Sequence, residues 1–214
     1  MAVRVRSFEE FDLSSVVEIH HRGMREGVLW RFSYSLRRDY FDWLTRNADS
    51  RTWVAQGELG RLVGFITISK PHLKPPMILS LRLFVAALLT MTKYPQTWRT
   101  VVFFATHRKF PFRTDDSREI VSFVVQEDFQ AHGVGAWLLK TGLSSEVKRG
   151  NSRFVSGISS PLLLKLYVRA FQATAIESKQ FGRIFGHHVS FEVPIKRWTS
   201  PKASLPSSSL YGEI

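Results

Sequence analysis

The chain has 214 residues, which is enough for one large domain with a buried core. Hydrophobic residues make up 44% and charged residues 22%, as is ordinary for a globular protein. The absence of cysteine excludes disulfides, thiolate metal ligands and a cysteine nucleophile. Lys and Arg exceed Asp and Glu by 12, so the charge favours an anionic partner: nucleic acid, an acidic membrane surface or a polyanionic cofactor.

The basic residues are scattered along the chain, and no nucleic-acid-binding motif or stripe of basic and aromatic residues accompanies them. Nucleic acid is therefore not the expected partner, although the charge leaves it as an alternative. No apolar run follows Met1–Arg6, so we expect no secretory signal and a cytoplasmic protein.

The first third of the chain predicts a strand, two helices and a β-hairpin. The pattern Ser7-Phe8-Glu9-Glu10 is typical of a capping box and predicts that the first helix opens there. The predicted elements are a strand at Ala2–Ser7, a helix out to about Glu26, a helix at Leu36–Thr45, and hairpin strands at Thr52–Gln56 and Leu62–Ser69.

A long insertion is expected at about 70–118. Within it, Met77–Thr92 is apolar except for one Ser, one Arg and two Thr residues. The run is shorter than the ~20 apolar residues of a transmembrane helix. We expect a core or interface helix, and the alternative is a helix that lies on a membrane or covers a lipid-like substrate.

The second half predicts alternating strands and helices, with one domain spanning 1–198 and a Ser/Pro-rich tail at 199–214. Ile120–Val125 is β-branched and apolar, as a buried strand is. The other elements are predicted as a helix at about Gly135–Arg149, a strand at Arg153–Ile158, a helix at Ser160–Ala170, and strands at Thr174–Ser178 and His188–Pro194.

A glycine-containing loop, Gln130–Ala136, joins the buried strand to the helix that follows it. The free N–H groups and partial positive charge of a helix N-terminus attract phosphate. Gly133 and Gly135 let the backbone approach an anion closely. The loop therefore predicts a site for a phosphate-bearing ligand.

The stretch Val124–Gly135 resembles the acyl-CoA-binding motif of the GNAT superfamily of N-acyltransferases. That motif reads Gln or Arg, two residues, Gly, one residue, then Gly or Ala, after a strand. In this chain Glu127 stands where family members often have proline. The resemblance implies an α/β fold with a mixed, mostly antiparallel central sheet flanked by helices, and a helical insertion before the motif strand.

The resemblance also implies how acetyl-CoA, or another acyl-CoA, binds. The pyrophosphate would be held by the backbone amides of Gln130, Ala131, His132, Gly133, Val134, Gly135 and Ala136. The pantetheine arm would pair with the strand around Phe123, Val124 and Val125. A main-chain N–H near Val125 would stabilise the oxyanion.

A second stretch, Phe154–Ser160 followed by Tyr167, resembles the next strand and helix of the family. Family members usually have asparagine at the start of that helix and tyrosine seven residues later. Ser160 and Tyr167 have this spacing, with serine in place of asparagine. Tyr167 is the candidate acid for the leaving thiolate, with a core tyrosine as the alternative. Ser160 is a candidate contact of the coenzyme or a plain helix N-cap.

The general base is the least determined group. Glu119, at the head of the motif strand, is the first choice, and a surface residue at a strand end is the alternative. His107 is a weaker candidate, and ordered water can also carry the proton. Trp30, Phe32 and Tyr34 either wall the acceptor pocket or belong to the core.

No metal site is expected. The pairs His20-His21 and His187-His188 are adjacent in sequence, and adjacent side chains point in different directions.

By resemblance, the expected function is direct transfer of an acetyl or acyl group from acetyl-CoA to a primary amine of a small molecule, through a ternary complex. The acceptor would be a compound such as an amino sugar or an amino acid derivative. The alternative is a catalytically inactive GNAT-like module that binds nucleic acid or a partner protein through its basic surface.

Overall fold

The structure is a computed structural model, which describes residues 3–24, 29–71, 73–94, 116–158, 167, 174–176 and 187–192. Seven strands form one sheet in the order β1-β2-β3-β4-β5-β7-β6. The strands are β1 Arg4–Ser7, β2 Ser50–Gln56, β3 Leu62–Ser69, β4 Ser117–Val125, β5 Arg153–Ile158, β6 Thr174–Ile176 and β7 His187–Glu192. All neighbours are antiparallel except β4 and β5, which confirms the expected fold class.

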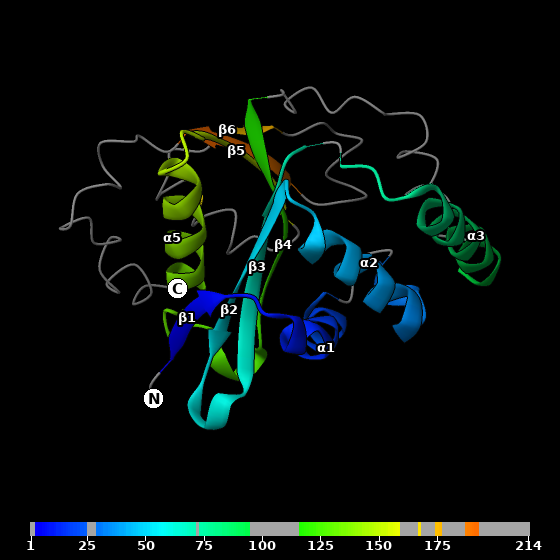
Figure 1. Ribbon diagram of the computed structural model, residues 1–214, viewed down its shortest axis with the longest axis horizontal. Helices are drawn as coiled ribbons and strands as arrows, with labels where there is room; N and C mark the ends of the chain where they lie inside the picture. The colour runs from blue at the N-terminus through cyan, green and yellow to red at the C-terminus, as the bar shows by residue number, and fades with distance from the viewer. Residues whose placement is uncertain are drawn as a thin grey trace.

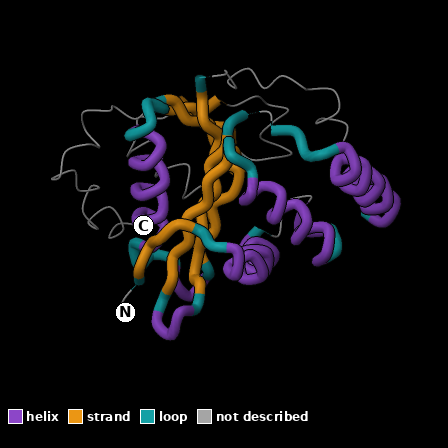
Figure 2. Tube along the Cα trace, in the orientation of Figure 1, coloured by secondary structure: helices purple, strands orange, loops and turns teal. Residues whose placement is uncertain are grey.

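Helices cover both faces of the sheet (Figure 1). The α-helices are α1 Leu13–Gly23, α2 Tyr34–Arg46, α3 Met77–Lys93 and α5 Val134–Val147, with short 3-10 turns η1 Glu10–Asp12, η2 Leu29–Arg31, η3 Glu58–Gly60 and η5 Glu127–Phe129. Helix α5 packs on one face, and α1 and α2 pack on the other. Helix α3 lies outside α2, away from the sheet, as the tube in Figure 2 also shows. None of the helices in the described part of the chain is long and apolar enough to cross a membrane.

Two clusters of buried apolar side chains fill the layers on either side of the sheet. The α5 side holds Trp53, Ala55, Val63, Ile66, Ile68, Ile120, Val134, Leu138, Leu139, Leu143, Val147, Phe154 and Tyr167. The α1 and α2 side holds Leu13, Val16, Val17, Ile19, Phe41, Leu44, Val54, Leu62, Phe65 and Val124. Burial of this much apolar surface is the main favourable contribution to folding. The packed sheet in turn determines where the loops at its ends lie.

The start of the first helix differs from the sequence prediction. Ser7 belongs to β1 and pairs with Trp53, so it does not cap a helix. The cap lies further along, where the Asp12 carboxylate accepts a hydrogen bond from the Glu9 N–H at 2.9 Å. The same carboxylate accepts two hydrogen bonds from the Arg6 guanidinium, at 2.6 and 2.8 Å. The Asp12 side chain, 3% exposed, satisfies both groups and caps the η1 turn. Helix α1 begins directly after this turn, at Leu13, without a side-chain cap hydrogen bond of its own.

The remaining predicted elements in the described residues are found within a few residues of their expected bounds. Helix α2 begins earlier than expected because the Ser33 hydroxyl accepts from the Leu36 N–H and caps it. The connection from β3 to β4 contains α3. The predicted helix at Ser160–Ala170 lies outside the described residues, apart from Tyr167, which is helical, and the tail at 199–214 lies outside them entirely.

A buried carboxylate ties the end of α5 to the sheet. The Glu146 side chain, 2% exposed, forms ion pairs with Arg51 of β2 at 3.2 Å and Arg118 of β4 at 3.3 Å. The Asn151 side-chain amide donates to the same carboxylate at 2.9 Å. Such a buried charge is tolerated only because its partners compensate its lost hydration. The cluster fixes the position of α5 relative to β4.

Candidate functional site

Strands β4 and β5 pair only along the first half of β4. Ser117–Ile120 pairs with Arg153–Ser156, but β4 continues to Val125. A β-bulge lies at the same point, because Thr67 of β3 pairs with Ser122 while the next residue, Ile68, pairs with Ile120. The extra residue is Val121. A bulge bends its strand and increases its twist, so it helps β4 to diverge from β5. No described strand pairs with the edge of the second half of β4 that faces away from β3, and this is called the open edge below.

The open edge presents backbone groups of β4. The Gln126 N–H donates to the Val63 carbonyl of β3 at 2.9 Å. Because N–H groups alternate in direction along a strand, those of Phe123 and Val125 point away from β3. That direction faces the edge where β5 no longer pairs. The edge can therefore form hydrogen bonds with an extended ligand chain.

The loop after β4 is held close to this edge. The Gln130 side-chain amide donates to the Val125 carbonyl at 3.0 Å. The His132 Nδ1 lies 2.7 Å from the Gln130 carbonyl oxygen. The turn η5 is closed by the Phe129 N–H, which donates to the Gln126 carbonyl at 2.9 Å. These contacts place the start of α5 beside the end of β4.

The N-terminus of α5 has the geometry expected of an anion site. Gly133 is its N-cap, with a left-handed φ of 79°, and a Cβ added there would meet no atom within 4 Å. Gly135 lies against β4: a Cβ there would approach the Phe123 ring at 3.3 Å and Val125 at 3.6 Å. The first N–H groups of a helix have no intrahelical acceptor, so those of Val134–Ala136 are available to an anion at the N-terminal end of α5. Glycine thus keeps the helix close to the strand and the approach to its amides clear.

Tyr167 lies where the two strands diverge. Its side chain is fully buried and packs in the same cluster as Ile120 and Phe154. Its hydroxyl interacts with the Ser156 hydroxyl, and Ser156 pairs with Ile120 at the last matched position before the strands separate. Burial raises the pKa of Tyr167 well above its ordinary value, and the interaction with Ser156 opposes that shift. The phenol therefore keeps its proton at neutral pH.

Glu119 is partly buried in β4, opposite Ser69 of β3. Its neighbours Arg118 and Ile120 face α5, through the ion pair with Glu146 and the apolar cluster. Side chains alternate along a strand, so Glu119 points to the opposite face, the one that α1 and α2 cover. The structure thus puts Glu119 and Tyr167 on different sides of β4. The candidates Ser160 and His107 lie outside the described residues.

The aromatic residues between α1 and α2 differ in their surroundings. Phe32 is buried against Leu36 and Leu79. Trp30 stacks on His21, with ring centroids 5.8 Å apart, while Tyr34 is 45% exposed. Phe32 therefore belongs to the core, and the other two lie nearer the surface.

The described residues fit a ligand with an extended arm and a phosphate group. The open edge of β4 matches the arm, and the clear N-terminus of α5 next to it matches the anion. The loop, the strand and Tyr167, which the sequence predicts as site residues, lie in one region of the structure, and their roles stay predictions. The sequence does not predict that Ser156 contacts the Tyr167 hydroxyl, because a single serine in a strand is common. It does not predict the bulge at Val121 either, because Val121 is one of several valines in the strand.

Comparison with known proteins gives matches in structure alone. No protein-family model matches the chain, and no curated protein matches its sequence. The ribosomal-protein-S18-alanine N-acetyltransferase from Escherichia coli is similar, with a TM-score of 0.54 at 12% identity over 91% of this chain and 94% of that one. An acetyltransferase of the GNAT family from Staphylococcus aureus Mu50 has a TM-score of 0.57 at 8% identity over 90% and 100% of the two chains.

A third similar structure contains a ligand. The PaiA N-acetyltransferase from Thermoplasma acidophilum, in complex with coenzyme A, has a TM-score of 0.55 at 11% identity over 90% of this chain and 100% of that one. At these identities the similarities establish the fold.

Proposed function

Because the chain has the fold of the GNAT N-acetyltransferases, we propose that it transfers an acetyl or related acyl group from acyl-CoA to a primary amine of a small molecule. The observation that carries the proposal is the open edge of β4 next to the glycine-bearing N-terminus of α5. Fold alone would not suffice, because one fold supports many functions. These two features together fit an acyl-CoA.

The geometry supports a specific set of binding residues. Backbone amides of Gln130–Ala136 would hold the pyrophosphate, with Gly133 leaving room for it. The N–H groups of Phe123 and Val125 would pair with the pantetheine arm along the open edge. The amide near Val125 is the proposed oxyanion donor. Acetyl-CoA bound in this way would supply an activated thioester.

Two proton transfers accompany the chemistry. The amine nitrogen bonds to the thioester carbon, the carbon–sulfur bond breaks, the nitrogen loses a proton and the thiolate gains one. Tyr167 is the proposed donor to the thiolate, since burial keeps its phenol protonated. Glu119 is the proposed base, directly or through water. It lies on the α1 and α2 face, where we place the acceptor, an amino sugar or amino acid derivative.

Coenzyme binding is the first test. We expect acetyl-CoA and CoA to bind wild-type protein in calorimetry, and Gly133→Leu to raise Kd by on the order of tenfold or more by obstructing charge-assisted hydrogen bonds. Gly150→Leu is a matched control, because Gly150 also has a positive φ, 89°, and open surroundings, but lies at the other end of α5. Equal affinities of the two variants would rule out the loop as the anion site.

The role of Tyr167 needs a turnover assay. Once an amine screen gives an acceptor, Tyr167→Phe is expected to lower kcat by roughly a hundredfold or more while Kd for CoA stays unchanged, because only the proton donor is lost. Thermal melting checks that the buried ring still packs. Undiminished kcat in this variant would show that another group or water donates the proton.

A further inference from the structure

Helix α3 has an apolar face that the described residues leave uncovered. Met77 and Ile78 are 84% and 72% exposed, and Leu81, Phe84 and Leu89 are between 56% and 66% exposed. Val85 and Leu88 are exposed as well. The opposite side packs on α2 and η2 through Leu79, Leu83, Ala86 and Ala87, in a cluster with Phe32 and Leu36. Helix α3 is therefore apolar on two sides, and the described residues cover only one of them.

The exposed residues form a continuous stripe. Their spacing of three or four residues places them along one side of the helix, from Met77 in its first turn to Leu89. Single exposed apolar residues are ordinary, but a contiguous patch marks an interaction surface. Figures 1 and 2 show α3 at the outer edge of the molecule, on the far side of α2 from the sheet.

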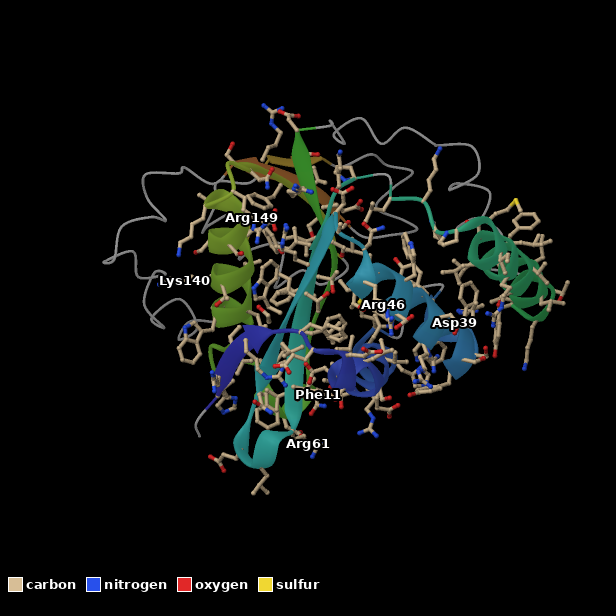
Figure 3. The ribbon with its side chains drawn as sticks, viewed as in Figure 1. Phe11, Asp39, Arg46, Arg61, Lys140 and Arg149 are labelled. Atoms are coloured by element: carbon tan, nitrogen blue, oxygen red, sulfur yellow. The ribbon has the colours of Figure 1, made fainter. Side chains whose placement is uncertain are left out.

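The sequence on either side of α3 carries charge of one sign only. Between Glu58 and Asp115 the sequence has nine Lys and Arg residues and no Asp or Glu, so this stretch carries +9 of the net +12. In the structure, Lys70 and Lys74 are exposed before α3, and Lys93 is exposed at its C-terminal end. Arg82 pairs with Asp39 of α2, which Figure 3 labels. The cations flanking the apolar stripe are thus complementary to a negatively charged surface.

The C-terminal end of α3 adds an interfacial feature. Tyr94 is 37% exposed, and the Arg31 guanidinium lies 4.4 Å from the centre of its ring. Tyrosine with a neighbouring cation is favoured at the headgroup level of a bilayer. The stacking also attaches the end of α3 to η2, so the helix is presented as a fixed part of the molecule.

We propose that α3 docks on an anionic lipid bilayer, with the stripe at the boundary of headgroups and acyl chains and the lysines at the lipid phosphates. Nucleic acid would explain the cations but give Leu81 and Phe84 no partner. A spanning helix is excluded for α3 by its length and by its contact with α2. The inference is independent of acyl transfer, since it requires neither coenzyme nor turnover.

Vesicle co-sedimentation of the full chain tests the proposal. We expect binding to phosphatidylcholine vesicles containing phosphatidylserine, and much weaker binding to phosphatidylcholine alone or at high salt. The double variant Leu81→Glu/Phe84→Glu should lower partitioning roughly tenfold or more. Phe11→Glu/Leu59→Glu is the control, because it makes the same charge change at residues 71% and 104% exposed elsewhere. Circular dichroism verifies that both variants fold.

Three results would overturn the proposal. One is failure of the wild type to bind phosphatidylserine vesicles at low salt. Another is equal loss of binding in both double variants, which would make net charge and not α3 the cause. The third is a wild-type dimer in light scattering that Leu81→Glu/Phe84→Glu dissociates and that does not bind vesicles, because a second copy of the chain would then cover the stripe.

Discussion

His20 shows how burial alters one titratable side chain. It is 2% exposed in α1, with its ring edge-on to Phe41 of α2 at a centroid distance of 4.9 Å. Burial lowers its pKa to about 4, and the positive charges of Arg37 and, when protonated, His21 act in the same direction. The folded protein therefore holds His20 neutral over the pH range where an unfolded histidine takes up a proton.

This shift predicts a loss of stability in mild acid. The unfolded histidine has a pKa of about 6.5, so between about pH 6.5 and 4 the unfolded state binds a proton that the folded state does not. The free energy of unfolding should fall by about 2–3 kcal/mol from pH 7 to 4.5 because of His20 alone. Urea unfolding at both pH values should show a smaller fall for His20→Met, which keeps an apolar side chain of similar size.

Carboxylates also titrate in this range. The contribution of His20 is therefore read from the difference in pH dependence between variants and not from the decrease in the free energy of unfolding of the wild type. His132→Gln is the control, because His132 is exposed in the loop before α5. The control should retain the full pH dependence of the wild type. If His20→Met and wild type lose the same free energy between the two pH values, His20 does not titrate differently in the folded and unfolded states.

Among the secondary-structure elements, α5 is the one whose position decides the site. Its N-terminal end approaches β4 at Gly135, and its C-terminal end is fixed by Glu146, which pairs with Arg51 and Arg118. A shift of the helix along β4 would break these charged contacts in a buried place, where unpaired charge is costly. The loop that joins β4 to α5 is therefore held between two fixed elements, which suits an anion site that must be formed before its ligand binds.

Local patterns in the sequence were sufficient for most elements. The predicted strand Arg153–Ile158 has the bounds of β5, because it lies between the Gly150 turn and a predicted helix cap. The capping-box pattern at Ser7–Glu10 predicts too early a start for the first helix, because Ser7 pairs within the sheet and Arg6 of the same strand binds Asp12 further along. The bulge at Val121 could not be predicted, since it depends on pairing with β3. Long-range contacts of this kind leave no periodic trace in a single sequence.

Helix α3 illustrates another limit of sequence patterns. An apolar run such as Met77–Thr92 predicts a helix but not how many of its sides are covered. In the structure Leu79 is buried while Leu81 is 61% exposed, two residues away. The side that packs is chosen by the positions of Phe32 and Leu36, which come from another part of the chain. The sequence of α3 alone therefore does not predict which of its apolar residues are exposed.

At the scale of the whole molecule, the sheet consists of two parts joined over a short distance. Strands β1–β4 pair along most of their length, and β5–β7 do the same, but the two parts meet only through Ser117–Ile120 and Arg153–Ser156. Figure 1 shows β5 and β6 beside one end of β4. Beyond the junction, no strand in the described part of the chain pairs with this edge of β4, so the edge has room for an extended chain to add as a further strand.

Hydrogen exchange can detect such an added strand. On saturation with CoA, we expect slower amide exchange in peptides covering Val121–Val125 and Gln130–Ala136, because the ligand occupies the N–H groups at the open edge and at the start of α5. Peptides from β1 and β2, which lie away from the junction, should exchange as before. Gly133→Leu should lose the protection in both regions at the same CoA concentration, whereas Gly150→Leu should retain it. Protection of the loop without β4 would place the phosphate correctly but refute pairing of the ligand arm with the strand.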